Sequence, residues 1–192
     1  MRKFTWIFAL SLFLALPAIG QDTPQVEVFG GGGVARADIG GADLNLYGWN
    51  GAVTENVNKW LGGTADFSGF YGRQTQLGPG LVPVDVNVSA HTFMFGPHFA
   101  YRKAGAFTPF AHVLLGGMRA SEGYIDSKTT PGGLSQSATK FAAAFGGGID
   151  IRVHKHVAVR IFQADYMVTP FLGLRQDNVR ISAGIVFRFG KR

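Results

Sequence analysis

The chain has 192 residues, of which 16% are charged and 46% are hydrophobic, with 28 glycines and 17 phenylalanines. Soluble domains carry about 25% charged residues, so this composition argues against an ordinary soluble protein, and its aromatic content excludes a disordered one. The chain has no cysteine, which excludes disulfides and cysteine-bound metals, and its net charge of +6 includes no basic run longer than two residues, so nucleic-acid binding is not indicated.

Residues 1–20 have the features of a secretory signal peptide. A short basic stretch precedes an apolar run at residues 6–16, and the small residues Ala18 and Gly20 provide a cleavage site. The apolar run is shorter than the ~20 residues that a membrane-spanning helix needs, which disfavours the alternative of a membrane anchor. We therefore expect residues 21–192 to form one exported domain.

Apolar residues alternate with small or polar ones throughout this domain. In residues 140–152, for example, Phe141, Phe145 and Ile149 fall on one face of a strand, and small or charged residues fall on the other. Alternation sustained over ~10 residues is typical of a transmembrane β-strand. Eight such segments are predicted, at residues 25–36, 43–54, 59–72, 86–102, 106–119, 138–152, 156–167 and 178–190.

The seventh segment is the least regular of the eight. Arg160 and Asp165 lie an odd number of residues apart, so both cannot point to the same side of an undistorted strand. Either a bulge lies between these two residues or the strand changes its role near its end.

The predicted connections alternate between short and long. The short ones are at residues 55–58, 103–105 and 153–155, and the long ones are at residues 37–42, 73–85, 120–137 and 168–177. Short turns at one end and long loops at the other are the layout of bacterial outer-membrane barrels. With the mature N-terminus in the periplasm, every long connection lies outside the cell, and both chain termini lie in the periplasm.

The last segment, VRISAGIVFRFG at residues 179–190, completes this prediction. Its odd-numbered residues are apolar and would face lipid, whereas Arg180 and Arg188 would face a polar interior. Closure against the first strand leaves no sheet edge with unpaired backbone groups in hydrocarbon. The predicted fold is all-β: an eight-stranded antiparallel transmembrane β-barrel with an up-and-down meander.

Three stretches resemble a known family: FMFGPHFAYRKAGAFTPFAHVLLGG at residues 93–117, FAAAFGGGIDIRVHKHVAVRIFQADY at residues 141–166, and the terminal RISAGIVFRFG. They are similar to the bacterial outer-membrane β-barrel domains related to the OmpA transmembrane domain, and the resemblance covers the whole of residues 21–192. It implies an outer-membrane location, contact with outer-membrane lipid and lipopolysaccharide, and recognition by the barrel-assembly machinery, which reads the aromatic end of the last strand.

The inward faces carry a set of charged residues: Glu27, Asp66, Asp150, Arg160, Arg180 and Arg188, with His98 and His112 as further candidates. The interior of an eight-stranded barrel is only just filled by its side chains, and buried charges must be paired. We therefore expect an ion-pair network that plugs the lumen. The alternative is a gated narrow pore or a proton path.

Catalytic and metal sites are weakly indicated. A lipid-acting site would need a nucleophilic serine near a histidine, and Ser89 is the nearest hydroxyl to the strand histidines. No G-x-S-x-G motif occurs, and His154 and His156 have no obvious third ligand for a metal. Glycine runs at residues 30–33 and 146–148 lack the Lys-Ser/Thr of a phosphate loop. We expect no catalytic residues, no metal and no cofactor.

The predicted function is a structural or surface-recognition role, in envelope integrity or adhesion, with four outer loops that present an unidentified ligand-binding surface. Loops carry recognition without a readable code, so the ligand stays open. The alternatives are a narrow passive channel and a lipid-modifying barrel enzyme. A soluble carrier resembling lipocalins is disfavoured, because the face with Phe93, Phe95, Phe99 and Tyr101 is too apolar for water.

Overall fold

A computed structural model describes residues 23–39, 42–77, 83–103, 106–125, 135–171 and 174–191. Eight strands account for nearly all of these residues: β1 (Val26–Ile39), β2 (Ala42–Asn56), β3 (Leu61–Leu77), β4 (Pro83–Ala100), β5 (Phe107–Ile125), β6 (Ser135–His154), β7 (Val157–Phe171) and β8 (Leu174–Phe189). Among them is no helix that is long and apolar enough to cross a membrane. The expected signal peptide lies outside the described residues.

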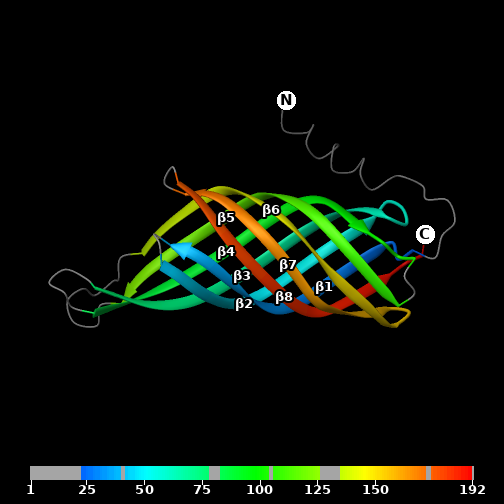
Figure 1. The fold of residues 1–192 in the computed structure, drawn as a ribbon, viewed down its shortest axis with the longest axis horizontal. Helices are drawn as coiled ribbons and strands as arrows, with labels where there is room; N and C mark the ends of the chain where they lie inside the picture. The colour runs from blue at the N-terminus through cyan, green and yellow to red at the C-terminus, as the bar shows by residue number, and fades with distance from the viewer. Residues whose placement is uncertain are drawn as a thin grey trace, which may run out of the picture.

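The eight strands form a closed antiparallel barrel in which each strand pairs with the next in the chain (Figure 1). β8 closes the barrel on β1, with a register that runs from Val26 opposite Phe189 to Arg36 opposite Val179. The predicted fold class and all eight predicted segments are confirmed. Closure leaves no strand at an open edge of the sheet, where unpaired backbone groups would face an apolar surrounding.

The two ends of the barrel differ, and we name them by their connections. At the turn end lie the short connections that follow β2, β4 and β6, and β1 begins and β8 ends there, on the right in Figure 1. At the opposite, loop end, β3 and β4 reach farthest to the left. Most residues of the predicted long connections belong to strands instead: β3 continues to Leu77 and β5 to Ile125.

A bulge interrupts β7, which decides between the two alternatives that the sequence left open. The pairing of β7 with β8 slips between Arg160 and Gln163, and the side chains of Ile161 and Phe162 are both exposed. The extra residue reverses the parity of the strand. Arg160 and Asp165 therefore both point into the lumen, where each is nearly fully buried.

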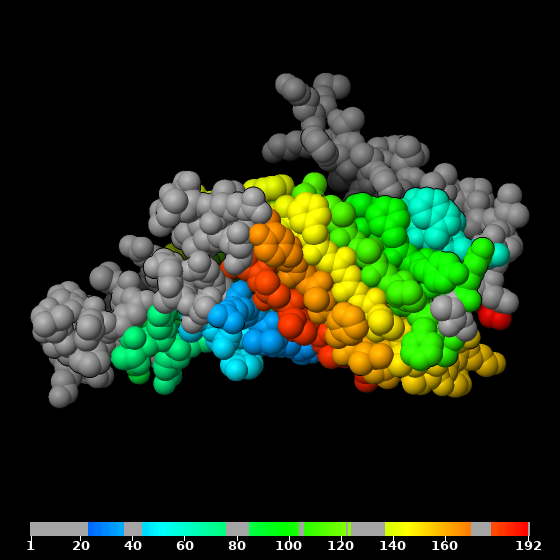
Figure 2. Space-filling view, viewed as in Figure 1, coloured from blue at the N-terminus to red at the C-terminus, as the bar shows by residue number. Residues whose placement is uncertain are grey.

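An apolar band surrounds the turn-end half of the barrel. The outward residues Phe93, Phe95 and Phe99 of β4, and Tyr101 directly after it, are 40–58% exposed. Figure 2 shows many ring-bearing side chains on the green, yellow and orange segments of the wall. Apolar side chains exposed in such a continuous band indicate contact with lipid.

In the loop-end half, inward and outward positions continue to alternate, but polar residues take the outward positions and apolar residues take the inward ones. Beyond His91 the outward residues of β4 are Ser89 and Asn87, whereas Val88 and Val86 point inward and are buried. Neighbouring strands follow the same change, because Arg73 of β3 lies opposite Asn87. Polar residues outside and apolar residues inside are the pattern of a sheet surrounded by water. The strands therefore extend beyond the lipid.

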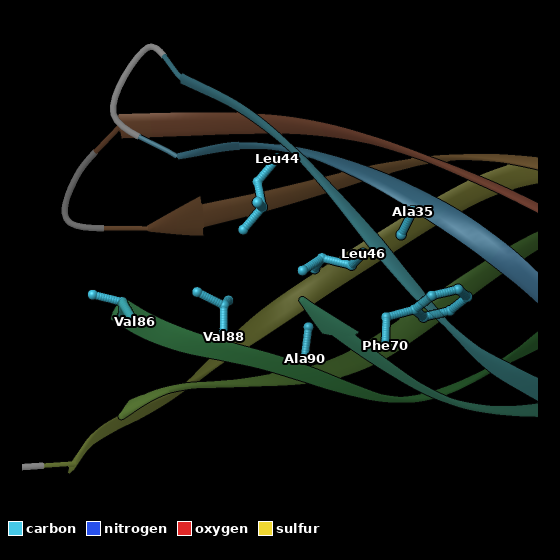
Figure 3. Packing of buried hydrophobic residues seen from close by; sticks show 7 residues of the cluster. All are labelled: Ala35, Leu44, Leu46, Phe70, Val86, Val88 and Ala90. Atoms are coloured by element: carbon cyan, nitrogen blue, oxygen red, sulfur yellow. The ribbon is translucent and has the colours of Figure 1, made fainter. Parts of the chain in front are cut away.

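The buried residues of this half form an apolar cluster, which we call the loop-end core. Figure 3 shows its side chains directed into the barrel from β1, β2, β3 and β4. Its members are Ala35, Leu44, Leu46, Phe70, Val86, Val88 and Ala90. The expectation of a polar interior is therefore wrong for this half, because water, not lipid, surrounds the wall there and the hydrophobic effect favours apolar side chains inside. The same reversal explains why the predicted connections were too long.

Candidate functional site

The six charged residues predicted to face the lumen all lie there, and each is 6% exposed or less. They come from five strands, β1, β3, β6, β7 and β8. They form two groups, one at mid-barrel around Arg180 and one at the turn end around Glu27. Together with their hydrogen-bonding partners, we call these groups the lumen network.

Arg180 is the centre of the mid-barrel group and is fully buried. Its Nη1 donates to Asp66 Oδ1 at 2.8 Å, and its Nε donates to Asp165 Oδ2 at 2.8 Å. Asp66 is on β3, which is three strands away from β8 around the barrel. The Arg180–Asp66 ion pair therefore crosses the bore instead of running along the wall.

Asp165 is a carboxylate of the network that the sequence analysis missed. Besides Arg180, it accepts from His112 Nε2 at 2.7 Å and from Gln163 Nε2 at 2.8 Å. An undistorted strand would have turned Asp165 toward lipid, and only the bulge in β7 brings it inside. The signal that could have found it is the break in parity itself, since a charged residue on the lipid face is costly.

Arg160 forms the second part of the mid-barrel group. It binds Asp150 through two parallel hydrogen bonds, from Nε at 2.8 Å and from Nη2 at 3.1 Å, and Nη1 donates to Gln163 Oε1 at 2.6 Å. Its guanidinium carbon lies 4.3 Å from the ring centroid of Phe29 and 4.1 Å from that of Phe110. Such sandwiches combine cation–π attraction with packing.

The two rings come from opposite walls, because β1 and β5 are four strands apart in either direction around the barrel. The stack Phe29–Arg160–Phe110 therefore spans the lumen. The period-two pattern assigned inward positions to polar residues and gave no reason to include these rings. Their parity on β1 and β5, in phase with Glu27 and His112, was the available signal.

Glu27 organises the group at the turn end. Its Oε1 accepts from Arg188 Nε at 2.9 Å, and its Oε2 accepts from Arg102 Nη2 at 2.7 Å and from Asn56 Nδ2 at 3.1 Å. Arg102 follows the end of β4, so its bond to β1 also crosses the bore. The sequence analysis missed Arg102 as a partner, although it is in phase with His98 on the inner face.

The charges of the lumen network balance. Its four carboxylates are Glu27, Asp66, Asp150 and Asp165, and its four guanidinium groups are Arg102, Arg160, Arg180 and Arg188. Each charge has an opposite partner within ion-pair distance. Because an unpaired charge in a water-poor interior costs several kcal/mol, the network holds these side chains in one arrangement.

Several buried polar atoms of the described lumen residues have no hydrogen-bond partner in the protein. They are Asn50 Oδ1, both ring nitrogens of His98, Arg102 Nε, both amide atoms of Asn178, Ser182 Oγ and Arg188 Nη2, and also Arg180 Nη2, whose contact with Asp165 at 2.7 Å is an ion pair. The His98 ring stacks on Phe110 with centroids 5.1 Å apart. Such atoms in barrel interiors are commonly satisfied by water.

The described residues offer little for catalysis or metal binding. Across ranges 23–39, 42–77, 83–103, 106–125, 135–171 and 174–191, no three His, Cys, Asp or Glu side chains group closely enough to hold a metal ion. His91 Nε2 is hydrogen-bonded to the hydroxyl of Tyr71 at 3.0 Å. The rings of His154 and His156 lie 5.8 Å apart in an exposed turn.

Several solved structures share this architecture. Neisserial surface protein A matches with a TM-score of 0.65 and 14% identity, over 86% of this chain and 97% of that chain. The attachment invasion locus protein of Yersinia pestis, in complex with the heparin analogue sucrose octasulfate, matches with a TM-score of 0.59 and 18% identity, over 86% and 99%. The outer membrane protein OprG from Pseudomonas aeruginosa matches with a TM-score of 0.52 and 14% identity, over 88% and 98%.

A comparison with curated protein sequences found no significant match. The model of the family described as "Outer membrane protein beta-barrel domain" matches residues 6–187. This match, the closed eight-stranded meander and the apolar band agree with one another. The chain therefore belongs to the outer membrane protein beta-barrel domain family and is a bacterial outer-membrane protein.

Proposed function

We propose that the protein is a closed outer-membrane scaffold that acts through the surface at its loop end, in adhesion or in envelope integrity. The observation that carries this proposal is the Arg180–Asp66 ion pair, which crosses the bore where both side chains are almost completely buried. The Phe29–Arg160–Phe110 stack supports closure at a second place. The side chains that fill the lumen in this way act as a plug.

The extension of the strands beyond the lipid supports a role at the cell surface. The ends of β3, β4 and β5 that point away from the lipid belong to a sheet with its own apolar core. Binding residues are often found on loops that a rigid scaffold positions. A barrel of the same architecture, the attachment invasion locus protein, has been solved with a heparin analogue, which is consistent with recognition as a role for such a barrel.

The test compares a deletion strain with strains that express the wild type or a loop variant. In the loop variant, residues 78–82 and 126–134 are replaced by short Gly-Ser linkers; in the matched control, residues 155–156 at the turn end are replaced instead. Heat-modifiable gel migration verifies that each barrel is folded. We expect the deletion to reduce surface adhesion or detergent resistance, and the loop variant, unlike the control, to fail to restore adhesion. A deletion strain unchanged in both properties would contradict the proposal.

A narrow channel is the second candidate, and one observation favours it. The unpartnered polar atoms of His98, Asn178 and Ser182 could line a single file of water molecules beside the lumen network. Conduction would then require Arg180 to leave Asp66, at the cost of exposing a buried carboxylate. A lipid-modifying activity forms no part of the proposal, because the side chains of His91 and His112 are hydrogen-bonded to Tyr71 and Asp165 and not to a serine.

A further inference from the structure

Exposed cations gather at the turn end of the barrel. We call this set the basic rim, and its members are Lys59, Lys103, Arg152, Lys155 and Lys191. Glu55 is the carboxylate that accompanies them outside the lumen among the residues that the structure describes at this end. The rim is therefore a region of strong positive charge.

The remaining charges of the barrel cancel. The lumen network contains four guanidinium groups and four carboxylates. Among the described residues, the strand segments toward the loop end contain five cations, Arg36, Arg73, Arg119, Lys140 and Arg175, and five carboxylates, Asp38, Asp43, Asp85, Glu122 and Asp177. The excess positive charge of the described residues is thus concentrated at the turn end, which indicates an anionic partner there.

The rim directly borders the apolar band. Trp60 follows Lys59 in the chain, and its ring stacks on that of Phe99 with centroids 6.2 Å apart. Tyr101 and Phe107, on either side of the turn that carries Lys103, are also more than half exposed. Exposed aromatic side chains at the end of such a band lie at the level of lipid headgroups, and neighbouring lysines extend their ammonium groups into the same layer.

Hydrogen bonds hold the first turn in place. Asn58 Oδ1 accepts from the backbone N–H groups of Trp60 at 2.9 Å and of Leu61 at 2.8 Å. Arg102 Nη1 donates to the carbonyl oxygen of Lys59 at 2.9 Å. Because the backbone at Lys59 is fixed, an anion bound there would order only the lysine side chain, which keeps the entropic cost of binding small.

We propose that the basic rim binds the phosphate groups of anionic phospholipids in the membrane leaflet at the turn end. Short turns of outer-membrane barrels face the periplasm, so this is the phospholipid leaflet. The turns join neighbouring strands and lie on the circumference of the wall, where lipid headgroups can reach Lys59, Lys103 and Lys155. This position favours lipid over a partner that would approach along the barrel axis.

The two tryptophans of the exported domain report on different levels of the barrel, because Trp60 borders the rim, whereas Trp49 lies at the middle of β2, opposite Gly69 of β3. The protein is purified from outer membranes as Trp49→Phe, which leaves Trp60, or as Trp60→Phe, which leaves Trp49. Each is placed in phosphatidylcholine vesicles that contain a minor fraction of brominated phosphatidylglycerol or, as the reference, of brominated phosphatidylcholine. The ratio of the two quenching efficiencies gives the local enrichment of the anionic lipid.

We expect about fivefold enrichment at Trp60 and none at Trp49. The triple variant Lys59→Gln, Lys103→Gln and Lys155→Gln should reduce the ratio at Trp60 toward one, and high salt should do the same because the groups are exposed. The matched variant Arg73→Gln and Arg119→Gln at the loop end should leave the Trp60 ratio unchanged.

An equal ratio at Trp60 and Trp49 would overturn the proposal, as would enrichment at Trp60 that persists in the triple variant. Salt-sensitive binding of the wild type to purified peptidoglycan sacculi, lost in the triple variant and found together with no lipid enrichment, would assign the rim to the cell wall instead. Neither outcome depends on whether the lumen conducts.

Discussion

Replacement of Arg180 by methionine should destabilise the barrel by about 3–5 kcal/mol, because it leaves buried carboxylates without their counterion. Arg180 is fully buried and binds both Asp66 and Asp165. Asp165 keeps two donors in the variant, His112 and Gln163. Within the part of the chain that the structure describes, Asp66 is left with one side-chain donor, the amide of Asn50 at 3.0 Å.

This difference predicts which second substitution rescues the variant. Asp66→Asn removes the less compensated charge and should recover most of the lost stability, whereas Asp165→Asn should recover less. The free energy of unfolding is measured by urea titration in lipid vesicles, with tryptophan fluorescence as the readout. Arg119→Met is the matched control: Arg119 is exposed and donates to the hydroxyl of Ser137 at 3.4 Å, so its loss should change stability by less than about 1 kcal/mol.

A buried ion pair that loses one partner costs more than about 1 kcal/mol. An Arg180→Met variant whose free energy of unfolding falls by less than this, with the fold and the Phe29–Arg160–Phe110 stack intact, would therefore refute the prediction. Equal rescue by Asp66→Asn and Asp165→Asn would refute the assignment of the remaining donors.

Two further pairs of substitutions test the wall of the barrel by the same unfolding assay. Phe95→Arg puts a charge in the apolar band and should reduce the free energy of unfolding by about 2–4 kcal/mol. Ser89→Arg, on the same face of β4 but beyond the apolar band, should reduce it by less than about 0.5 kcal/mol. Equal losses would show that the lipid does not end between the two residues. Gly184→Ala should reduce the free energy of unfolding by about 1–3 kcal/mol, because the added Cβ would collide with the carbonyl group of Gly30 across the closing pair of strands. In Gly63→Ala the added Cβ meets no atom within 4 Å, so this control should be tolerated. A Gly184→Ala barrel as stable as the wild type would contradict the close approach of β1 and β8.

The sequence predicted the part of the fold that the bilayer determines. Within the apolar band every outward residue must be compatible with lipid, so period two is strict, and the eight strands and the closing role of residues 179–190 follow from it. Beyond the band, the same strands obey the opposite rule. Outward Arg73 and Thr75 were predicted to lie in a connection, although β3 continues through them to Leu77.

The lumen residues could be predicted only where the strands are regular. Asp66 and Arg180 were assigned to the interior by parity, and they meet across the bore. Asp165 could not be assigned, because the position of a bulge depends on how β7 fits both of its neighbours. The ion-pair partners could not be predicted from the sequence either. Arg180 reaches β3 and Arg188 reaches β1 because of the stagger of the strands around the barrel, and the sequence of a single strand does not determine this stagger.

Conductance in a planar lipid bilayer tests the closed lumen most directly. The folded protein is inserted, and its insertion is verified independently, for example by protease protection of the barrel. The account predicts a silent bilayer for the wild type, because an ion pair and a cation–π stack cross the bore. Discrete ion-selective steps in the wild type that change in Arg180→Ala would contradict it and identify the protein as a narrow channel.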